Sequence, residues 1–133
     1  SVLAVDVDFF KSINDAHGHD AGDKVLQELA SRMQDSIRNV DMACRVGGEE
    51  FTVILPATDI ETAKKIAERV RNSVSSRPFP VSAGPGVVNV TVSIGVAALA
   101  GPRDTFEDFL KRADQALYAA KRGGRNRVTL AAA

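Results

Sequence analysis

The sequence predicts a single α/β domain, of the α+β type, in which helices pack around one central mixed sheet. Three observations support this fold class. The chain has 133 residues, the size of one domain and enough to bury a substantial core. Strand-like and helix-like patterns alternate in the order strand, helix, hairpin, helix, strand, helix. No internal repeat, low-complexity tract or linker interrupts that order, so we expect residues 1–133 to form one domain.

The first half of the chain contains a strand, two helical segments and a hairpin. Residues 2–7 have the pattern of a buried strand, and residues 8–16 that of a turn and a short helix. Helical spacing then predicts a longer helix, whose buried face comprises Leu26, Leu29, Met33, Ile37 and Val40. Residues 42–46 and 51–55 are apolar and form the two arms of the predicted hairpin.

The second half begins with a helix that Asp59 is expected to cap. The predicted buried face of this helix comprises Ala63, Ile66, Ala67, Val70 and Val74. Residues 77–86 contain three prolines and predict a short edge strand followed by a loop, because proline cannot donate to a sheet ladder. Residues 87–99 are rich in β-branched side chains and predict a strand.

The last predicted helix ends in the sequence KRGGRN, with Gly123 or Gly124 as its C-cap. Its apolar residues at helical spacing are Phe106, Leu110, Ala113 and Leu117. A short strand is expected after it, at residues 127–129. Together these elements predict one mixed sheet with helices packed around it.

Composition excludes several classes of protein. Seventeen basic residues balance seventeen acidic ones, tryptophan is absent and aromatic residues make up 5% of the chain, so we expect no nucleic-acid partner. No apolar run approaches the roughly 20 residues of a membrane helix, and we expect no membrane contact. The single cysteine, Cys44, excludes an internal disulfide and is typical of a reducing compartment. We therefore expect a cytoplasmic location.

The segment 43–56, ACRVGGEEFTVILP, places two glycines and two glutamates between the hairpin arms. A Gly-Gly pair is typical of a tight turn. Glu49 and Glu50 would then lie together at the tip, where their charges repel each other. One interpretation is that they only keep the tip soluble. The other is that their carboxylates bind a ligand.

Two further carboxylates, those of Asp6 and Asp8, lie at the end of the first predicted strand, on one face of it. Carboxylates at the exit of a buried strand are unfavourable unless they are solvated, paired or bound to metal. If this strand lies beside the hairpin, Asp6 converges with Glu49 and Glu50. Such a group of oxygens suits a hard cation such as Mg2+. The alternative is a capped strand–helix turn beside a solvated hairpin.

The start of the following helix offers a phosphate site. The backbone N–H groups of Phe9 and Phe10 lie there, beside Lys11. Free N–H groups at a helix N-terminus bind phosphate, and a neighbouring cation strengthens the site. The pattern differs from a Walker loop but favours metal–phosphate chemistry.

Several separated motifs agree in order and spacing with one family. RVGGEEF follows DVDFFKSINDAHGHDAGD, and VTVSIGVA and RADQALYAAKRGGRNRV come later in the chain. Over essentially its whole length the chain resembles the GGDEF domain of diguanylate cyclases, in particular the output domains of response-regulator cyclases of the PleD type. Glutamate in the third place of the signature is one of its two common forms.

This resemblance implies a palm-like fold of the kind found in nucleotide cyclases, with the GGEEF hairpin at the active site. It implies that two GTP molecules condense to cyclic di-GMP and two pyrophosphates, with Mg2+ or Mn2+ as cofactor. Two copies of the domain must face each other for this reaction. An Arg-x-x-Asp site, here at residues 38–41, would bind the product as an inhibitor.

The resemblance also implies roles for individual residues. The metal ligands would be Asp6, the carbonyl of Val7, Glu49 and Glu50. Glu49 would also be the base for the attacking 3′-hydroxyl and, with Lys11, a catalytic residue. The phosphate ligands would be the amides of Phe9 and Phe10 with Lys11, Lys121 and Arg125. The guanine pocket would be formed by Asn14, His19, Asp23 and Leu26.

Each of these residue types has a common structural role as well. Asn14 and Asp23 could serve only as helix caps. Lys121 and Arg125 could be ordinary charges at the C-terminal end of a helix. We also expect the carboxylates of Asp6 and Glu49 to lie at solvent-accessible loop ends, so that catalysis depends on them and folding does not.

A second site is indicated by the sequence RNVD at residues 38–41. In the family that the chain resembles, Arg38 and Asp41 would form an inhibitory product site together with Arg69 from the next helix. Arginine offers a planar fork for phosphate or a guanine edge, and aspartate accepts the guanine N–H groups. The alternative is an exposed ion pair worth at most about 1 kcal/mol.

The chain departs from the family pattern at its start, where the segment resembling LTGL-NR is absent. We expect an N-terminally truncated domain whose dimerisation depends on a preceding regulatory domain. Two functions from different classes remain: an active diguanylate cyclase, and a catalytically silent module that binds GTP or cyclic di-GMP. A palm-type enzyme acting on nucleic acid is disfavoured by the zero net charge and the few aromatic residues.

Overall fold

A five-stranded mixed sheet forms the centre of the molecule. The structure is a computed structural model that describes residues 1–81 and 86–132. The strand order is β2 (Met42–Gly47), β3 (Glu50–Ile54), β1 (Val2–Val7), β6 (Val92–Ala97) and β7 (Val128–Leu130). All neighbours are antiparallel except β6 and β7, which are parallel. The predicted mixed sheet is therefore confirmed.

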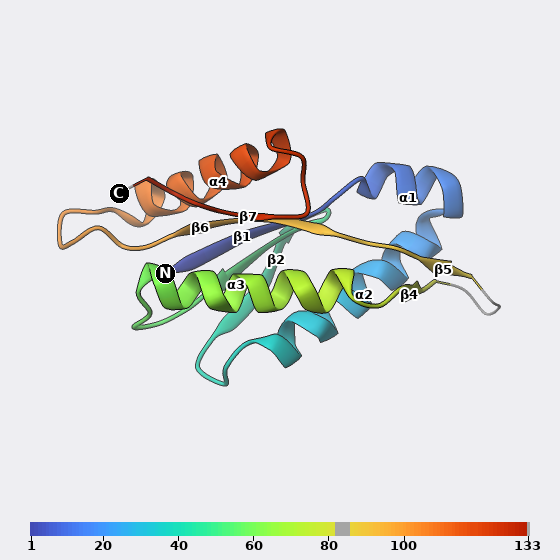
Figure 1. Cartoon of the computed structure of the whole chain (residues 1–133), viewed down its shortest axis with the longest axis horizontal. Coiled ribbons are helices and arrows are strands. Elements are labelled where there is room, and N and C mark those ends of the chain that lie inside the picture. Colours follow the sequence, from blue (N-terminus) through green and yellow to red (C-terminus); the bar gives the residue numbers. More distant parts are fainter. Residues whose placement is uncertain (82–85, 133) are drawn as a thin grey trace.

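Helices cover both faces of this sheet (Figure 1). In that view α4 (Phe106–Arg122) lies above the sheet, and α2 (His19–Ser36) and α3 (Ile60–Ser75) lie below it. The short α1 (Phe10–His17) extends beyond the end of β1. Both chain termini lie at the other end of the sheet.

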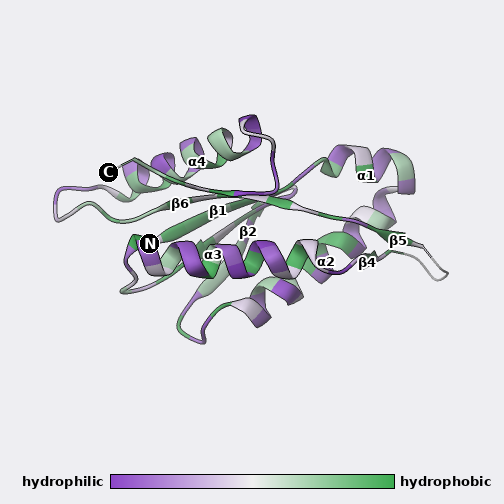
Figure 2. Cartoon of the chain, in the orientation of Figure 1, coloured by the Kyte–Doolittle hydropathy of each residue, from purple (hydrophilic) through white to green (hydrophobic). Residues whose placement is uncertain are grey.

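Each face of the sheet has its own apolar core. Leu3, Val5 and Val7 of β1 belong to the larger core, between the sheet and helices α2 and α3, whereas Val2 and Ala4 pack with α4. This alternation follows from the two-residue period of a strand. The strands are mostly apolar, while the helices carry apolar and polar residues on different sides (Figure 2). The central strand β1 is thus buried on both faces. Residues at its C-terminal end are therefore held in a fixed position.

The sequence-based account of α3 is confirmed. The side chain of Asp59 accepts a hydrogen bond from the Thr62 N–H at 2.8 Å, which satisfies one of the free donors of the helix start. The buried residues are the five predicted ones, Ala63, Ile66, Ala67, Val70 and Val74. Gly123 is likewise the C-cap of α4, as predicted.

The predicted end of α2 is wrong. The helix ends at Ser36 because Ile37 adopts an extended conformation, with φ −112° and ψ 168°. Val40 is therefore not part of the buried face and is 66% exposed. The turn that replaces the last helical turn is held by the Asp41 carboxylate, which accepts the Arg38 N–H at 2.8 Å.

Two further predictions need correction. In α4, Phe106 is 59% exposed, and Phe109 takes its place in the smaller core. The strand predicted over residues 87–99 divides into β5 (Val87–Val88), which pairs with β4 (Phe79–Pro80), and β6. Part of the loop predicted within residues 77–86, residues 82–85, lies outside the described residues. Among the residues described, no helix is both long and apolar enough to cross a membrane.

Candidate active site

The predicted metal and phosphate residues meet at one end of the sheet. There β1 leads into α1, and the tip of the β2–β3 hairpin and the C-terminal end of α4 lie nearby (Figure 1). A pocket of about 200 Å³ at this point is lined by Asp6, Val7, Asp8, Phe9, Phe10, Lys11, Glu49, Lys121 and Arg125. Of the residues predicted for metal and phosphate, only Glu50 does not line it.

The hairpin tip is held against the exit of β1. Asp6 lies opposite Glu50 in the β1–β3 register, and the Val7 N–H donates to the Glu49 carbonyl at 3.3 Å. At the turn, Gly48 has a φ of 48°, which glycine adopts without strain. The Arg45 Nε donates to the Gly48 carbonyl at 2.8 Å. These contacts place Glu49 on the wall of the pocket.

The expectation that Asp6 is solvent-accessible is wrong, since the residue is only 4% exposed. Burial raises the pKa of the Asp6 carboxyl above its usual range, a hydrogen bond from the Lys121 ammonium opposes that change, and the charges of Glu49 and Glu50 add to it. Lys121 is therefore more than a charge at a helix end. It compensates a carboxylate buried among other carboxylates.

The donor atoms around Asp6 determine whether a metal ion fits this pocket. Among residues 1–81 and 86–132, no three acidic, histidine or cysteine side chains lie close enough together to hold a metal ion. Asp6, Val7 and Glu49 nevertheless line one pocket, and their donors are oxygens. Oxygen donors with surplus negative charge are those that Mg2+ and Mn2+ prefer. The residue types present therefore fit such an ion.

The entrance to α1 has the features of an anion site. Phe9, its N-cap residue, has a left-handed conformation with φ 57°, and no side chain caps the helix. The first N–H groups of α1 thus lack a side-chain acceptor. The Arg125 guanidinium lies 4.6 Å from the centre of the Phe9 ring, and Lys11 and Lys121 line the same pocket. Three cations and free helix N–H groups together favour phosphate.

Asn14 and Asp23 do not cap helices: the N-cap residues of α1 and α2 are Phe9 and Gly18, and neither cap has a side-chain hydrogen bond. The Asn14 Oδ1 is instead buried without a hydrogen-bond partner among the described residues. A Cβ at Gly22 would lie 1.8 Å from this oxygen, so glycine is required there. A buried acceptor without a partner is unusual and suggests a ligand donor.

The four residues predicted to bind guanine are only partly brought together. Asp23 and Leu26 line a groove of about 410 Å³ between α2 and the hairpin, together with Arg45 and Phe51. Asn14 and the exposed His19 are not part of its lining. The structure thus places Asp23 and Leu26 on one surface and Asn14 at the α1–α2 contact.

Asp8 is the residue whose role the sequence did not indicate. Its carboxylate accepts hydrogen bonds from the hydroxyls of Thr91 and Ser93, both at 2.6 Å, and from the Asn126 N–H at 2.9 Å. The only local signal was its place two residues after Asp6. Its partners lie more than 80 residues away in the chain, beyond the reach of a motif.

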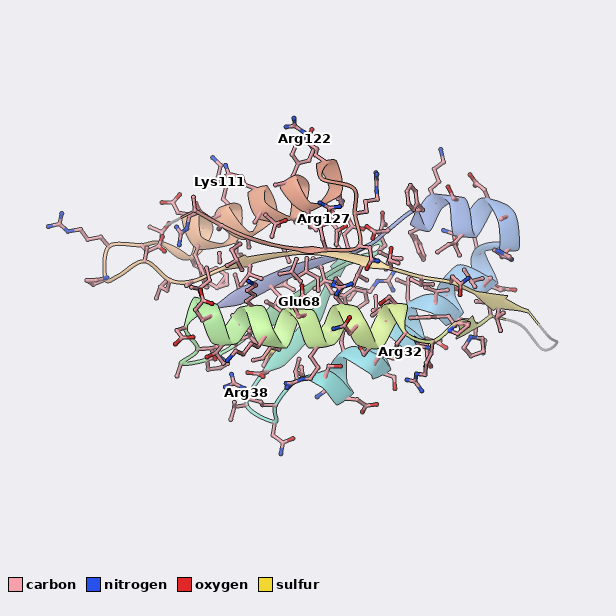
Figure 3. The ribbon with its side chains drawn as sticks, viewed as in Figure 1. Arg32, Arg38, Glu68, Lys111, Arg122 and Arg127 are labelled. Carbon is pink, nitrogen blue, oxygen red and sulfur yellow. The ribbon has the colours of Figure 1, made fainter. Side chains whose placement is uncertain are left out.

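The three residues of the predicted inhibitory site lie near the end of α2. Arg38 forms a two-pronged ion pair with Asp41, with Nε–Oδ2 and Nη2–Oδ1 distances of 2.9 and 2.7 Å (Figure 3 labels Arg38). This hydrogen bonding lowers the pKa of the Asp41 carboxyl. The Arg69 Nε donates to the Ser36 carbonyl at 2.7 Å. An ion pair is thus present, but it differs from the exposed pair of the alternative because the Asp41 side chain is completely buried.

Comparison with known proteins identifies the family. A family model described as "Diguanylate cyclase, GGDEF domain" matches residues 1–127. The response regulator PleD of Caulobacter vibrioides is 55% identical over 128 residues, which cover 96% of this chain and 28% of PleD. The chain thus spans little more than a quarter of that relative.

Solved structures agree in fold. The active GGEEF domain of a diguanylate cyclase from Vibrio cholerae superposes with a TM-score of 0.91 at 39% identity, covering 99% of this chain and 82% of that one. The GGDEF domain of DgcB from Caulobacter crescentus, solved in complex with c-di-GMP, has a TM-score of 0.91 at 38% identity, covering 97% and 75%. With the signature hairpin at the strand exit, these matches show that the chain belongs to the GGDEF family of diguanylate cyclase domains.

Proposed function

We propose that this domain condenses two GTP molecules into cyclic di-GMP and releases two pyrophosphates. The observation that carries the proposal is one pocket lined by two carboxylates and three cations, those of Asp6 and Glu49 and those of Lys11, Lys121 and Arg125. Phosphoryl transfer depends mainly on positioning and on neutralising charge, and these side chains are suited to both. Incubation with GTP and Mg2+, followed by separation of the nucleotides, tests the proposal.

In the proposed reaction the 3′-hydroxyl of one GTP attacks the α-phosphorus of the other, and pyrophosphate leaves. Glu49 accepts the proton of the attacking hydroxyl. A divalent cation held by Asp6, the Val7 carbonyl and Glu49, with Glu50 as a further ligand, would supply charge neutralisation at the phosphates. Lys11, the amides at the start of α1, Lys121 and Arg125 orient the triphosphate.

Guanine specificity is assigned to Asn14 and Asp23, with His19 and Leu26 beside the base. The buried Asn14 Oδ1 has no hydrogen-bond donor among the residues that the structure describes. A guanine N–H would supply one, whereas the matching edge of adenine differs in donors and acceptors. Adenine would leave buried polar groups unpaired, which is a strong basis for rejecting it.

The reaction needs two domains. One site of this kind holds one GTP, and a symmetric product requires two sites that face each other about a two-fold axis. We propose a homodimer as the active form, held together by regions beyond the apolar faces that the core already uses. Higher effective concentration of the second copy would then raise the rate.

We further propose product feedback at Arg38, Asp41 and Arg69. Arg38 is 40% exposed on its side chain, while the Asp41 side chain is completely buried, so the guanidinium can be reached from solvent. An exposed arginine fork suits the phosphates of a cyclic dinucleotide. Binding there would hold two domains in an unproductive arrangement and would not compete with GTP.

Replacing Arg38 with alanine is expected to weaken cyclic di-GMP binding about 10- to 150-fold, because it removes a charge-assisted contact of about 1.5–3 kcal/mol. Basal turnover should be kept and inhibition lost. Calorimetric titration of cyclic di-GMP into both proteins measures this. The control is Arg103→Ala, which removes an exposed arginine before α4. Equal affinities for the wild type and Arg38→Ala would mean that RNVD is only an ion pair.

A further inference from the structure

Asp8 is a buried carboxylate that the proposed reaction does not use. It is 4% exposed and lies directly after β1. Its Oδ1 accepts the Ser93 hydroxyl, and its Oδ2 accepts both the Thr91 hydroxyl and the Asn126 N–H. The Asp8 N–H also donates to the Thr91 carbonyl at 2.9 Å. One side chain thus ties the exit of β1 to β6 and to the loop after α4.

The segments joined by Asp8 hold unfavourable backbone conformations. Four non-glycine residues of the described chain have a positive φ, and three of them, Phe9, Arg125 and Asn126, adjoin the Asp8 contacts, with φ 57°, 64° and 45°. Asparagine tolerates this region, whereas a left-handed conformation is unfavourable for Phe9 and Arg125 and persists only when the surroundings enforce it. The hydrogen bond from the Asn126 N–H is one such constraint.

Those segments also carry the groups proposed to hold phosphate. Phe9 follows Asp8 and opens α1, while Arg125 precedes Asn126 and lies over the Phe9 ring at 4.6 Å. The two are far apart in sequence, and the hydrogen bond from the Asn126 N–H to the Asp8 carboxylate links the residue before Phe9 to the residue after Arg125. The distance between the α1 amides and the Arg125 guanidinium therefore depends on this bond.

We propose that Asp8 is a positioning residue for the triphosphate: its hydrogen bonds fix the left-handed turn at Phe9 against the loop of Arg125, so that both meet the same phosphates. This inference rests on the proposed function. Asp8 acts as a hydrogen-bond acceptor and not as a metal ligand. Both of its oxygens already accept strong hydrogen bonds from fixed donors, which leaves few lone pairs for an ion.

Because Asp8 is proposed to act as a hydrogen-bond acceptor, two substitutions at this position are expected to give opposite results. In Asp8→Asn the amide oxygen can accept from Thr91 and Asn126, and the amide N–H can donate to the Ser93 hydroxyl, which also accepts. All three contacts survive without the charge. In Asp8→Ala all three are lost. A metal ligand would instead fail in both variants, because an amide is a much poorer ligand than a carboxylate.

The experiment measures the KM for GTP, kcat, and the Kd for a non-hydrolysable GTP analogue with Mg2+, along with thermal unfolding. Asp8→Ala is expected to raise KM and Kd by about tenfold or more, which corresponds to the loss of one charge-assisted phosphate contact. Asp8→Asn should remain close to the wild type.

The control is Asp104→Ala. This side chain is similarly buried, at 7% exposed, and bridges a loop to α4 through Arg112, at the other end of the helix. It should lose stability and keep analogue affinity.

The inference would be overturned if folded Asp8→Ala bound the analogue with the wild-type Kd. It would also be overturned if Asp8→Asn bound the analogue but showed no metal-dependent turnover. If Asp8→Ala does not fold, Asp8→Ser replaces it, because serine keeps a polar atom but does not reach the Asn126 N–H. A wild-type protein that makes no cyclic di-GMP would refute the proposed function alone. The analogue affinities would still decide the role of Asp8.

Discussion

Replacing Glu49 with glutamine is expected to abolish cyclic di-GMP formation while the free energy of unfolding stays equal or rises. Loss of a positioned general base alone lowers the rate by about 10²–10⁴-fold, and loss of a metal ligand adds to this. Glu49 is only half-buried, and its charge acts against the buried carboxylate of Asp6. Glutamine keeps the shape of the side chain and removes that repulsion.

The measurement combines turnover of GTP with thermal unfolding of the same preparation. Glu107→Gln is the matched control, since Glu107 is an exposed residue in the first turn of α4, away from the pocket. It should turn over GTP at the wild-type rate. If Glu49→Gln turned over GTP near that rate, Glu49 would be removed from the mechanism. Marked destabilisation of Glu49→Gln would show that the role of this residue is structural.

Replacing Arg32 with methionine is expected to lower the free energy of unfolding by about 3 kcal/mol or more. Arg32 is a buried residue of α2, 4% exposed, and it lies at the C-terminal end of α3 (Figure 3). Its guanidinium donates, at 2.8–3.2 Å, to the carbonyls of Ser73, Val74, Arg77 and Pro78. The guanidinium also stacks on the ring of Phe79, 3.8 Å from its centre.

Carbonyls at the end of a helix have no partner within it, so the guanidinium both satisfies them and complements the helix dipole. Methionine keeps much of the apolar stem and removes every one of these donors. Denaturant unfolding measures the change. The control is Arg122→Met, an exposed arginine at the end of α4, which should change stability by no more than about 0.5 kcal/mol. Equal losses in the two variants would contradict the assigned role of Arg32.

Features with local causes were predicted well from sequence. The start of α3 depends on a capping side chain three residues from the N–H group that donates to it. The buried face of this helix follows a simple helical period. The hairpin and its glycine turn are similarly local. The convergence of Asp6 with the hairpin tip followed from a single assumption, that the first strand pairs with the hairpin, and the β1–β3 register confirms it.

Features that depend on distant partners were not predicted. The burial of Asp6 depends on Lys121, 115 residues away, and the contacts of Asp8 reach 118 residues along the chain. The end of α2 was misplaced because Val40 continues the apolar period, whereas the Arg38–Asp41 pair makes a turn that a period cannot reveal. The guanine residues were named from family resemblance, and their division between two surfaces required the structure.

The central claim is that two copies of this domain join two GTP molecules. The most direct test incubates the chain with GTP and Mg2+ over a dilution series and identifies the products chromatographically. We expect cyclic di-GMP and two pyrophosphates for each product molecule, no reaction of ATP, and a rate per chain that rises with concentration. Binding of GTP without turnover, or a rate per chain that stays constant on dilution, would contradict it.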